Sequence, residues 1–108
     1  MMKITKEVKD KGLLIFLEGE MDASTSILVD LEIDQFYRLE LTNLWIDCQK
    51  LHYISSAGVG VFISHLQKLH DLHKNFVLVG LKPKIRAVFS VLGLDTLFNA
   101  VPALENKP

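Results

Sequence analysis

Short apolar runs alternate with segments of helical periodicity along the sequence, and this alternation limits the folds that the chain can adopt. The clearest runs are residues 13–17 (LLIFL), 43–48 (NLWIDC) and 75–80 (NFVLVG), each bounded by polar residues or glycine. Runs of this length are typical of buried β-strands. Apolar residues recur at helical spacing after the second run, over 59–69, and after the third, over 85–92. Strands that alternate with helices predict a mostly parallel sheet joined by right-handed crossovers.

Two further strands are expected at the ends of this pattern. Residues 2–8 (MKITKEV) alternate in polarity as an edge strand does, and Asp10-Lys11-Gly12 is suited to a hairpin turn. Residues 97–101 (LFNAV) are a candidate last strand, after a helix that begins near Pro83. The expected order is β-β-α-β-α-β-α-β. We therefore predict an α/β fold with a mixed, mostly parallel central sheet of about five strands and helices packed on it.

Length and composition favour a single globular domain, 1–108, without a nucleic-acid or membrane partner. The chain has 108 residues, of which 49% are hydrophobic, enough for one core and too few for two. A formal net charge of −1 gives no basic surface for nucleic acid, and no apolar run approaches a membrane span. No signal peptide is evident at the start, so we expect a cytoplasmic protein. The one cysteine, Cys48, is expected to be a small core residue.

The first expected helix, roughly Ser24 to Leu39, has two apolar sides, and only one of them can face the sheet. The second side is covered by the rest of the domain, is turned by a kink, or is a face for a partner or for self-association as a homodimer. The sequence leaves these alternatives open. The two sides consist of Val29, Ile33, Phe36 and Tyr37, and of Ile27, Leu28, Leu31 and Leu39.

Two loops that follow expected strands carry the polar residues of a candidate site. They are GEMDAST (19–25) and HYISSAG (52–58). Functional groups in open parallel sheets gather at the carboxyl ends of the strands. If the two strands are neighbours, one edge of the molecule holds a set of five polar residues. These are Asp22, Ser24, Thr25, Ser55 and Ser56.

The segment Ser55-Ser56-Ala57-Gly58-Val59-Gly60 begins a helix in an unusual way. One serine hydroxyl is expected to be the N-cap, and the other is then left over. Each glycine costs a helix about 1 kcal/mol relative to alanine, so Gly58 and Gly60 indicate a bare surface that the sheet or a partner backbone approaches closely. An exposed hydroxyl here is accessible to a kinase, and a phosphate would meet free amides at the positive end of the helix dipole.

Enzymatic and metal sites are not indicated by the sequence. The nucleophile elbow Gly-x-Ser-x-Gly fails at Ser56, because position 54 is isoleucine. His65, His70 and His73 lack a cysteine or carboxylate pattern for metal binding and are expected to be solvated. No phosphate-binding glycine loop is present. We therefore expect no catalytic residue, no metal and no cofactor.

Taken together, these segments resemble the STAS domain family, which includes the anti-sigma factor antagonists and the C-terminal domains of sulphate transporters. The resemblance rests on GEMDAST (19–25), DCQKLHYISSAGVGVF (47–62) and a Lys-Pro before a helix that ends VLGL (91–94), and it spans nearly the whole chain. It implies a non-enzymatic protein that, when dephosphorylated, captures an anti-sigma factor and so releases a sigma factor. The partner is itself an ATP-dependent serine kinase that phosphorylates the antagonist, and a metal-dependent serine phosphatase reverses this step.

On this resemblance the phosphoacceptor is Ser56 and Asp22 is the acidic residue beside it. The implied partner surface comprises Asp22, Ser24, Thr25, Ser55, Ser56, Ala57, Gly58 and Gly60. Sporulation-type members have aspartate before the acceptor, whereas this chain has Ser55, which leaves Ser55 as an alternative acceptor. Two other functions stay open: a subunit of an ABC-type lipid-transport complex, and a scaffold subunit of a stress-sensing assembly.

Overall fold

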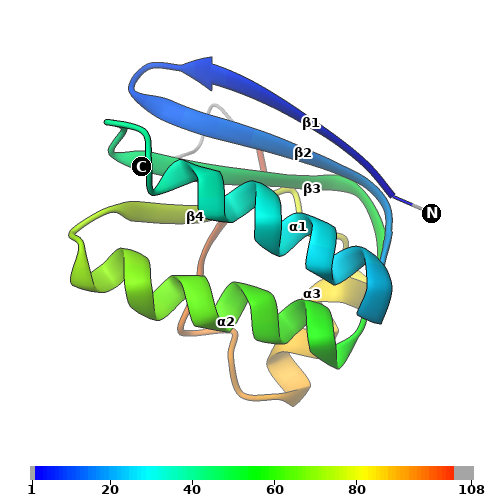
Figure 1. The fold of residues 1–108 in the computed structure, drawn as a ribbon. Coiled ribbons are helices and arrows are strands. Elements are labelled where there is room, and N and C mark those ends of the chain that lie inside the picture. Colours follow the sequence, from blue (N-terminus) through cyan, green and yellow to red (C-terminus); the bar gives the residue numbers. More distant parts are fainter. Residues whose placement is uncertain (1, 104–108) are drawn as a thin grey trace.

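The computed structural model describes residues 2–103, which form five strands and three helices (Figure 1). The strands lie in the order β1-β2-β3-β4-β5, with β1 antiparallel to β2 and the other neighbours parallel. This arrangement confirms the predicted α/β fold and its order of elements. The elements are β1 (Met2–Lys9), β2 (Gly12–Met21), α1 (Ala23–Phe36), β3 (Asn43–Ile54), α2 (Ser56–Asp71), β4 (Asn75–Val79), α3 (Pro83–Val91) and β5 (Asn99–Val101).

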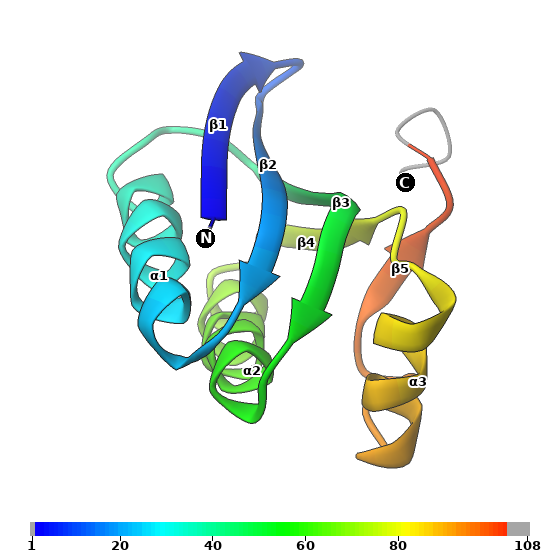
Figure 2. The ribbon, with the colours of Figure 1, turned by 90° about the vertical axis from the view of Figure 1, so that its right-hand side faces the viewer.

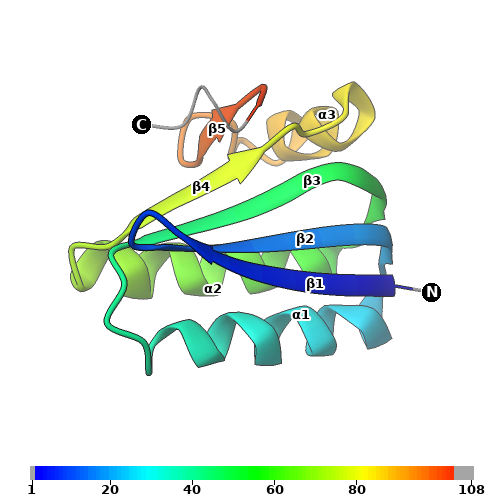
Figure 3. The ribbon, with the colours of Figure 1, turned by 90° about the horizontal axis from the view of Figure 1, so that it is seen from above.

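The main core lies between the sheet and the helices. Helices α1 and α2 run side by side along one face of the sheet (Figures 1 and 3), and α3 lies beside β5 (Figure 2). All three helices contribute to one apolar cluster, for example through Ile33, Phe62 and Phe89. Cys48 is fully buried in the same cluster, which confirms it as a core residue. A smaller cluster, which includes Trp45, lies on the other face.

The β1–β2 hairpin closes at the predicted place, but its turn has two residues, since Gly12 already belongs to β2. Asp10 and Lys11 both have positive φ angles, 50° and 59°, as a turn that matches the strand twist requires. Gly12 begins β2 beneath the indole of Trp45, where a Cβ atom would lie only 2.2 Å from the ring. Glycine is therefore needed at this position because the aromatic ring occupies the space of a side chain.

Several boundaries differ from the expected ones: β2 continues past residue 17 to Met21, and β5 begins at Asn99 rather than at residue 97. Strand β3 continues from the predicted end at residue 48 to Ile54, because β2 continues beside it as far as Met21 and supplies backbone partners for its polar part. Helix α1 ends at Phe36 rather than Leu39, and a tight turn follows in which the Leu39 N–H donates to the Phe36 carbonyl (3.0 Å).

Helix α1 buries only one of its two apolar sides. Val29 and Ile33 are fully buried against the sheet. On the other side, Ile27 and Leu31 are 62% and 55% exposed, and Leu28 and Leu39 are also exposed. Nothing in residues 2–103 covers this side, so the alternative in which the domain itself covers it does not hold for the described residues. No helix among these residues is both long enough and apolar enough to span a membrane.

Candidate functional site

The two polar loops meet at one edge of the sheet, because β2 and β3 are neighbouring parallel strands. Met21 and Ile54, the last residues of these strands, are register partners. The Ser55 N–H donates to the Met21 carbonyl at 2.9 Å, which fastens the start of α2 to the end of β2. Asp22 and Ser55 each follow directly and cap α1 and α2. The predicted neighbourhood of the two loops is therefore confirmed.

Asp22 is fixed in place by the first turn of α1. Its carboxylate accepts hydrogen bonds from the backbone N–H groups of Thr25 (2.9 Å) and Ser24 (3.0 Å), and from both hydroxyls. The Asp22 N–H in turn donates to the Thr25 hydroxyl, which completes a capping box. These bonds, the Thr25 backbone bond foremost, lower the pKa of Asp22 to about 2. The carboxylate is thus a fixed negative charge at this edge.

The two serines of the second loop have different roles. Ser55 is the N-cap of α2, and its Oγ accepts a hydrogen bond from the Gly58 N–H at 3.2 Å. Ser56 is the first residue of α2 and is exposed. Within the described residues its hydroxyl makes no hydrogen bond. The structure therefore leaves one hydroxyl of the pair available at the surface.

The two glycines also differ in their surroundings. A Cβ atom at Gly58 would lie 2.7 Å from Ile54 Cγ1 and 3.2 Å from the Met21 carbonyl oxygen, so α2 packs closely on the strand ends there. Gly58 is buried, and it supports the exposed residues at the start of α2 by letting the helix pack closely on the strand ends. Apart from its neighbours in the helix, no heavy atom of the described residues would lie within 4 Å of a Cβ atom at Gly60. Only Gly60 presents a bare outer surface, beside the exposed residues Ser56 and Ala57.

An apolar groove that the sequence analysis missed begins at Ser56. It has a volume of about 370 Å³ and is bounded on the other side by α3. Val91 and Leu92, which follow the buried Phe89, are 86% and 52% exposed along it. The clue in the sequence was Val91, an apolar residue that lies within the range of the 85–92 stripe but off its helical spacing. The groove is lined by Ser56, Lys84, Ala87, Val88, Val91 and Leu92.

The prediction for the histidines is wrong at His65. His70 and His73 are exposed, as predicted, but His65 is only 1% exposed and lies between α2 and α1. Its Nδ1 is 2.7 Å from the Tyr37 hydroxyl oxygen and its Nε2 is 2.6 Å from Asp30 Oδ1. Asp30 lies on α1 and Tyr37 directly follows that helix, so the spacing of residues within α2 could not reveal them. Burial, with the nearby Asp34 and Asp30 charges, raises the pKa of Tyr37 to about 12.

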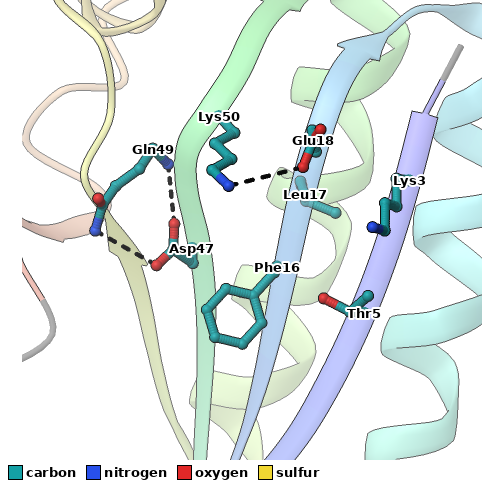
Figure 4. A pocket seen from close by; sticks show the side chains of 8 residues that line it. All are labelled: Lys3, Thr5, Phe16, Leu17, Glu18, Asp47, Gln49 and Lys50. Atoms are coloured by element: carbon teal, nitrogen blue, oxygen red, sulfur yellow. Dashed lines mark hydrogen bonds and ion pairs between the residues drawn. The ribbon is translucent and has the colours of Figure 1, made fainter.

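A second pocket lies on the face of the sheet opposite to α1 and α2 (Figure 4). It has a volume of about 400 Å³ and lies across β1, β2 and β3. Asp47 is buried at its side and accepts a hydrogen bond from the Gln49 N–H at 3.0 Å. The lining residues are Lys3, Thr5, Phe16, Leu17, Glu18, Asp47, Gln49 and Lys50. None of the residues singled out at the Ser56 edge lines this pocket.

Comparison with known proteins agrees with this architecture. The family model of the STAS domain matches residues 3–106. An anti-sigma-B factor antagonist of Listeria monocytogenes is 30% identical over 99 residues, which cover 89% of this chain and 87% of the relative.

Solved structures show the same fold. An anti-sigma factor antagonist of Mycobacterium paratuberculosis has a TM-score of 0.89 and 23% identity, covering 98% of this chain and 90% of that one. The phosphorylated form of SpoIIAA, a Bacillus cell fate determinant, has a TM-score of 0.70 and 21% identity, covering 93% and 90%. With the sequence matches, the chain belongs to the STAS domain family and, within it, to the anti-sigma factor antagonists.

Proposed function

We propose that this antagonist acts by binding, without catalysis, and that phosphorylation of Ser56 ends the binding. In the cytoplasm, the dephosphorylated form captures an anti-sigma factor that is also a serine kinase. The sigma factor that this partner had held is then released. The kinase then phosphorylates Ser56, and a serine phosphatase restores the binding form. The observation that carries this proposal is the exposed hydroxyl of Ser56, which makes no hydrogen bond to residues 2–103, beside the capping hydroxyl of Ser55.

The division of roles between the two serines favours Ser56 as the acceptor over Ser55. Phosphorylation of Ser55 would turn the Oγ that caps the Gly58 N–H into an ester oxygen, a poorer acceptor, and would add a bulky group at the N-cap of α2. Phosphorylation of Ser56 leaves that cap in place. A phosphate on Ser56 would also lie at the positive end of the helix dipole, which favours a negative charge. The fold therefore tolerates the modification, and its effect falls on the docked partner.

The proposed docking surface has a polar half and an apolar half on either side of Ser56. The polar half comprises Asp22, Ser24, Thr25, Ser55 and Ala57, with Gly60 as a bare patch and Gly58 supporting it from below. The apolar half is the groove beside α3, with Val91 and Leu92 exposed. A phosphate of about −2 charge on Ser56 would place a strongly hydrated group at the rim of this groove and oppose the burial of apolar surface.

Phosphopeptide mass spectrometry on protein from native cells, growing and stressed, tests the position of the phosphate. Trypsin should release residues 51–68, which contain Ser55, Ser56 and Ser64. We expect phosphate on Ser56 in an amount that changes with growth condition, and none on Ser64, an exposed serine that is the internal control. Phosphate on Ser55 alone, or none in any condition, would contradict the proposal.

Binding measurements with the cognate anti-sigma factor test the switch itself. Ser56→Ala should keep the fold and the binding but should no longer be released when ATP is added. Ser56→Asp should bind more weakly, because it places a charge at the same point. Asp22→Ala should weaken binding or phosphorylation more than it lowers the melting temperature. Release of Ser56→Ala by ATP at the wild-type rate would show that the switch lies elsewhere.

A further inference from the structure

Three potential metal ligands converge between α1 and α2, away from the edge that carries Ser56. They are the carboxylates of Asp30 and Asp34, four residues apart on α1, and the imidazole of His65 on α2. One ligand atom of each lies within 4.8 Å of the other two. The imidazole is buried, whereas the side chains of Asp30 and Asp34 are 43% and 49% exposed. The cluster is thus anchored in the core and open to solvent on one side.

We propose that Asp30, Asp34 and His65 bind one divalent transition-metal ion of the zinc type. The proposal does not rest on the phosphorylation of Ser56. One imidazole nitrogen and two carboxylate oxygens are ligands that Zn²⁺ accepts, and three protein ligands leave a fourth position for water on the exposed side. Imidazole argues against Mg²⁺ or Ca²⁺, which prefer oxygen ligands only.

The geometry of the cluster requires only small side-chain shifts to fit such an ion. Ligands about 2.0–2.1 Å from a tetrahedral Zn²⁺ lie roughly 3.4 Å from one another. In the structure, His65 Nε2 is 2.6 Å from Asp30 Oδ1 and 4.0 Å from Asp34 Oδ1. One separation must therefore lengthen by about 0.8 Å and the other shorten by about 0.6 Å. Both carboxylates are part-exposed, so rotation of these side chains is expected to supply the shifts, whereas the imidazole is buried.

Tyr37 is suited to position the imidazole for metal binding. In the neutral ring, Nε2–H donates to the Asp30 carboxylate, which can only accept, and the Tyr37 hydroxyl donates to Nδ1. Metal binding at Nε2 moves the ring proton to Nδ1, where it is donated to the Tyr37 oxygen once the hydroxyl has rotated. No net proton is lost from the ring. A hydrogen-bond partner on the second nitrogen is the usual support of a metal-bound histidine.

The charges of the cluster are consistent with a bound cation. Asp30 and Asp34 are like charges four residues apart on one helix, an arrangement that destabilises a helix when no cation lies between them. Asp30 has His65 as a partner. Within residues 2–103 the Asp34 carboxylate makes no hydrogen bond, because its Oδ1 lies 4.0 Å from His65 Nε2, too far for a hydrogen bond. A divalent ion would neutralise both carboxylates and would fasten α1 to α2.

Titration of the full-length protein with Co²⁺ and Zn²⁺ tests the site. We expect one Co²⁺ per chain with the visible absorption of tetrahedral cobalt, displaced by one equivalent of Zn²⁺, and a melting temperature that rises with Zn²⁺. Asp34→Asn removes a ligand without breaking the His65 hydrogen bonds and should weaken Zn²⁺ binding about tenfold or more. Tyr37→Phe should weaken it by about 10–100-fold, because the imidazole loses its support.

His70 and Asp71 supply the matched control. They form an exposed histidine–aspartate pair on α2, with His70 Nδ1 3.8 Å from Asp71 Oδ1. His70→Gln should leave the affinity and the cobalt spectrum unchanged if the metal lies at His65. The proposal is overturned if binding shows no saturation at one ion per chain, if it survives Asp34→Asn, or if His70→Gln abolishes it. Circular dichroism confirms that each variant is folded before titration.

Discussion

At the scale of single residues, the stability that the Asp22 cap gives to the start of α1 depends on pH. Its pKa lies near 2 in the folded chain and 3.8 in an ordinary environment, so the unfolded state binds the proton more tightly. The stabilisation is therefore complete above the unfolded value and is lost as the pH falls through the folded one. We expect the wild-type melting temperature to drop more steeply than that of Asp22→Asn between about pH 4 and pH 2. Parallel curves for the two proteins would contradict this prediction.

The two glycines of α2 form a matched pair for a second prediction. Gly58→Ala forces a methyl group against Ile54 and Met21, and overpacking of this kind costs about 1–3 kcal/mol, partly offset by about 1 kcal/mol of helix propensity. The methyl group of Gly60→Ala meets no atom of residues 2–103 outside its own helix and should raise stability by up to about 1 kcal/mol. Urea denaturation measures both. If Gly60 faces the partner, Gly60→Ala should also weaken anti-sigma binding. Destabilisation by Gly60→Ala would contradict the placement of Gly60 at a bare outer surface.

At the scale of elements, the two apolar sides of α1 are expected to contribute very differently to the stability of the fold. Leu31 is 55% exposed and Ile33 is fully buried, although they lie two residues apart. We expect Leu31→Gln to change the free energy of unfolding by less than about 0.5 kcal/mol, and Ile33→Ala to lower it by about 2–5 kcal/mol. Sedimentation should show weaker self-association for Leu31→Gln if this side is a homodimer face. A large stability loss in Leu31→Gln would mean that the side is covered.

The sequence was informative about elements and less so about contacts between them. The order of strands and helices follows from local periodicity, and the convergence of Asp22 with Ser55 follows once β2 and β3 are neighbours. The length of β3 could not be read locally, because its last residues are held by pairing with β2. The burial of His65 was missed for the same reason, since its partners Tyr37 and Asp30 lie 28 and 35 residues earlier.

At the scale of the whole molecule, the sheet has a strong centre and a weaker end. Strands β2 and β3 have 10 and 12 residues and pair along most of their length, whereas β5 has three residues and three register partners in β4. Helix α3 buries only Ile85 and Phe89. The end of the molecule is held by a row of edge-to-face rings, in which Phe98 lies between Phe76 (6.0 Å) and Phe89 (5.2 Å).

Native-state hydrogen exchange should therefore show that α3 and β5 open at a lower free energy than β2 and β3. Phe98→Leu should lower protection in α3 and β5 more than in β3, because it removes the central ring of the row. Ile46→Val, at the fully buried centre of β3, is the control and should lower protection throughout, by about 0.5–1.5 kcal/mol. Equal protection across the sheet, or a uniform effect of Phe98→Leu, would contradict this division.

The weak end of the molecule is also the end that forms the groove beside Ser56, because α3 supplies most of the lining. A partner docked there would hold α3 in place, so anti-sigma binding should slow exchange in α3 by more than in β3. If phosphorylation of Ser56 ends the binding as proposed, it should return α3 to its free exchange rate without changing β3. Exchange that slows equally in both elements would mean that the partner stabilises the fold as a whole and does not contact the groove.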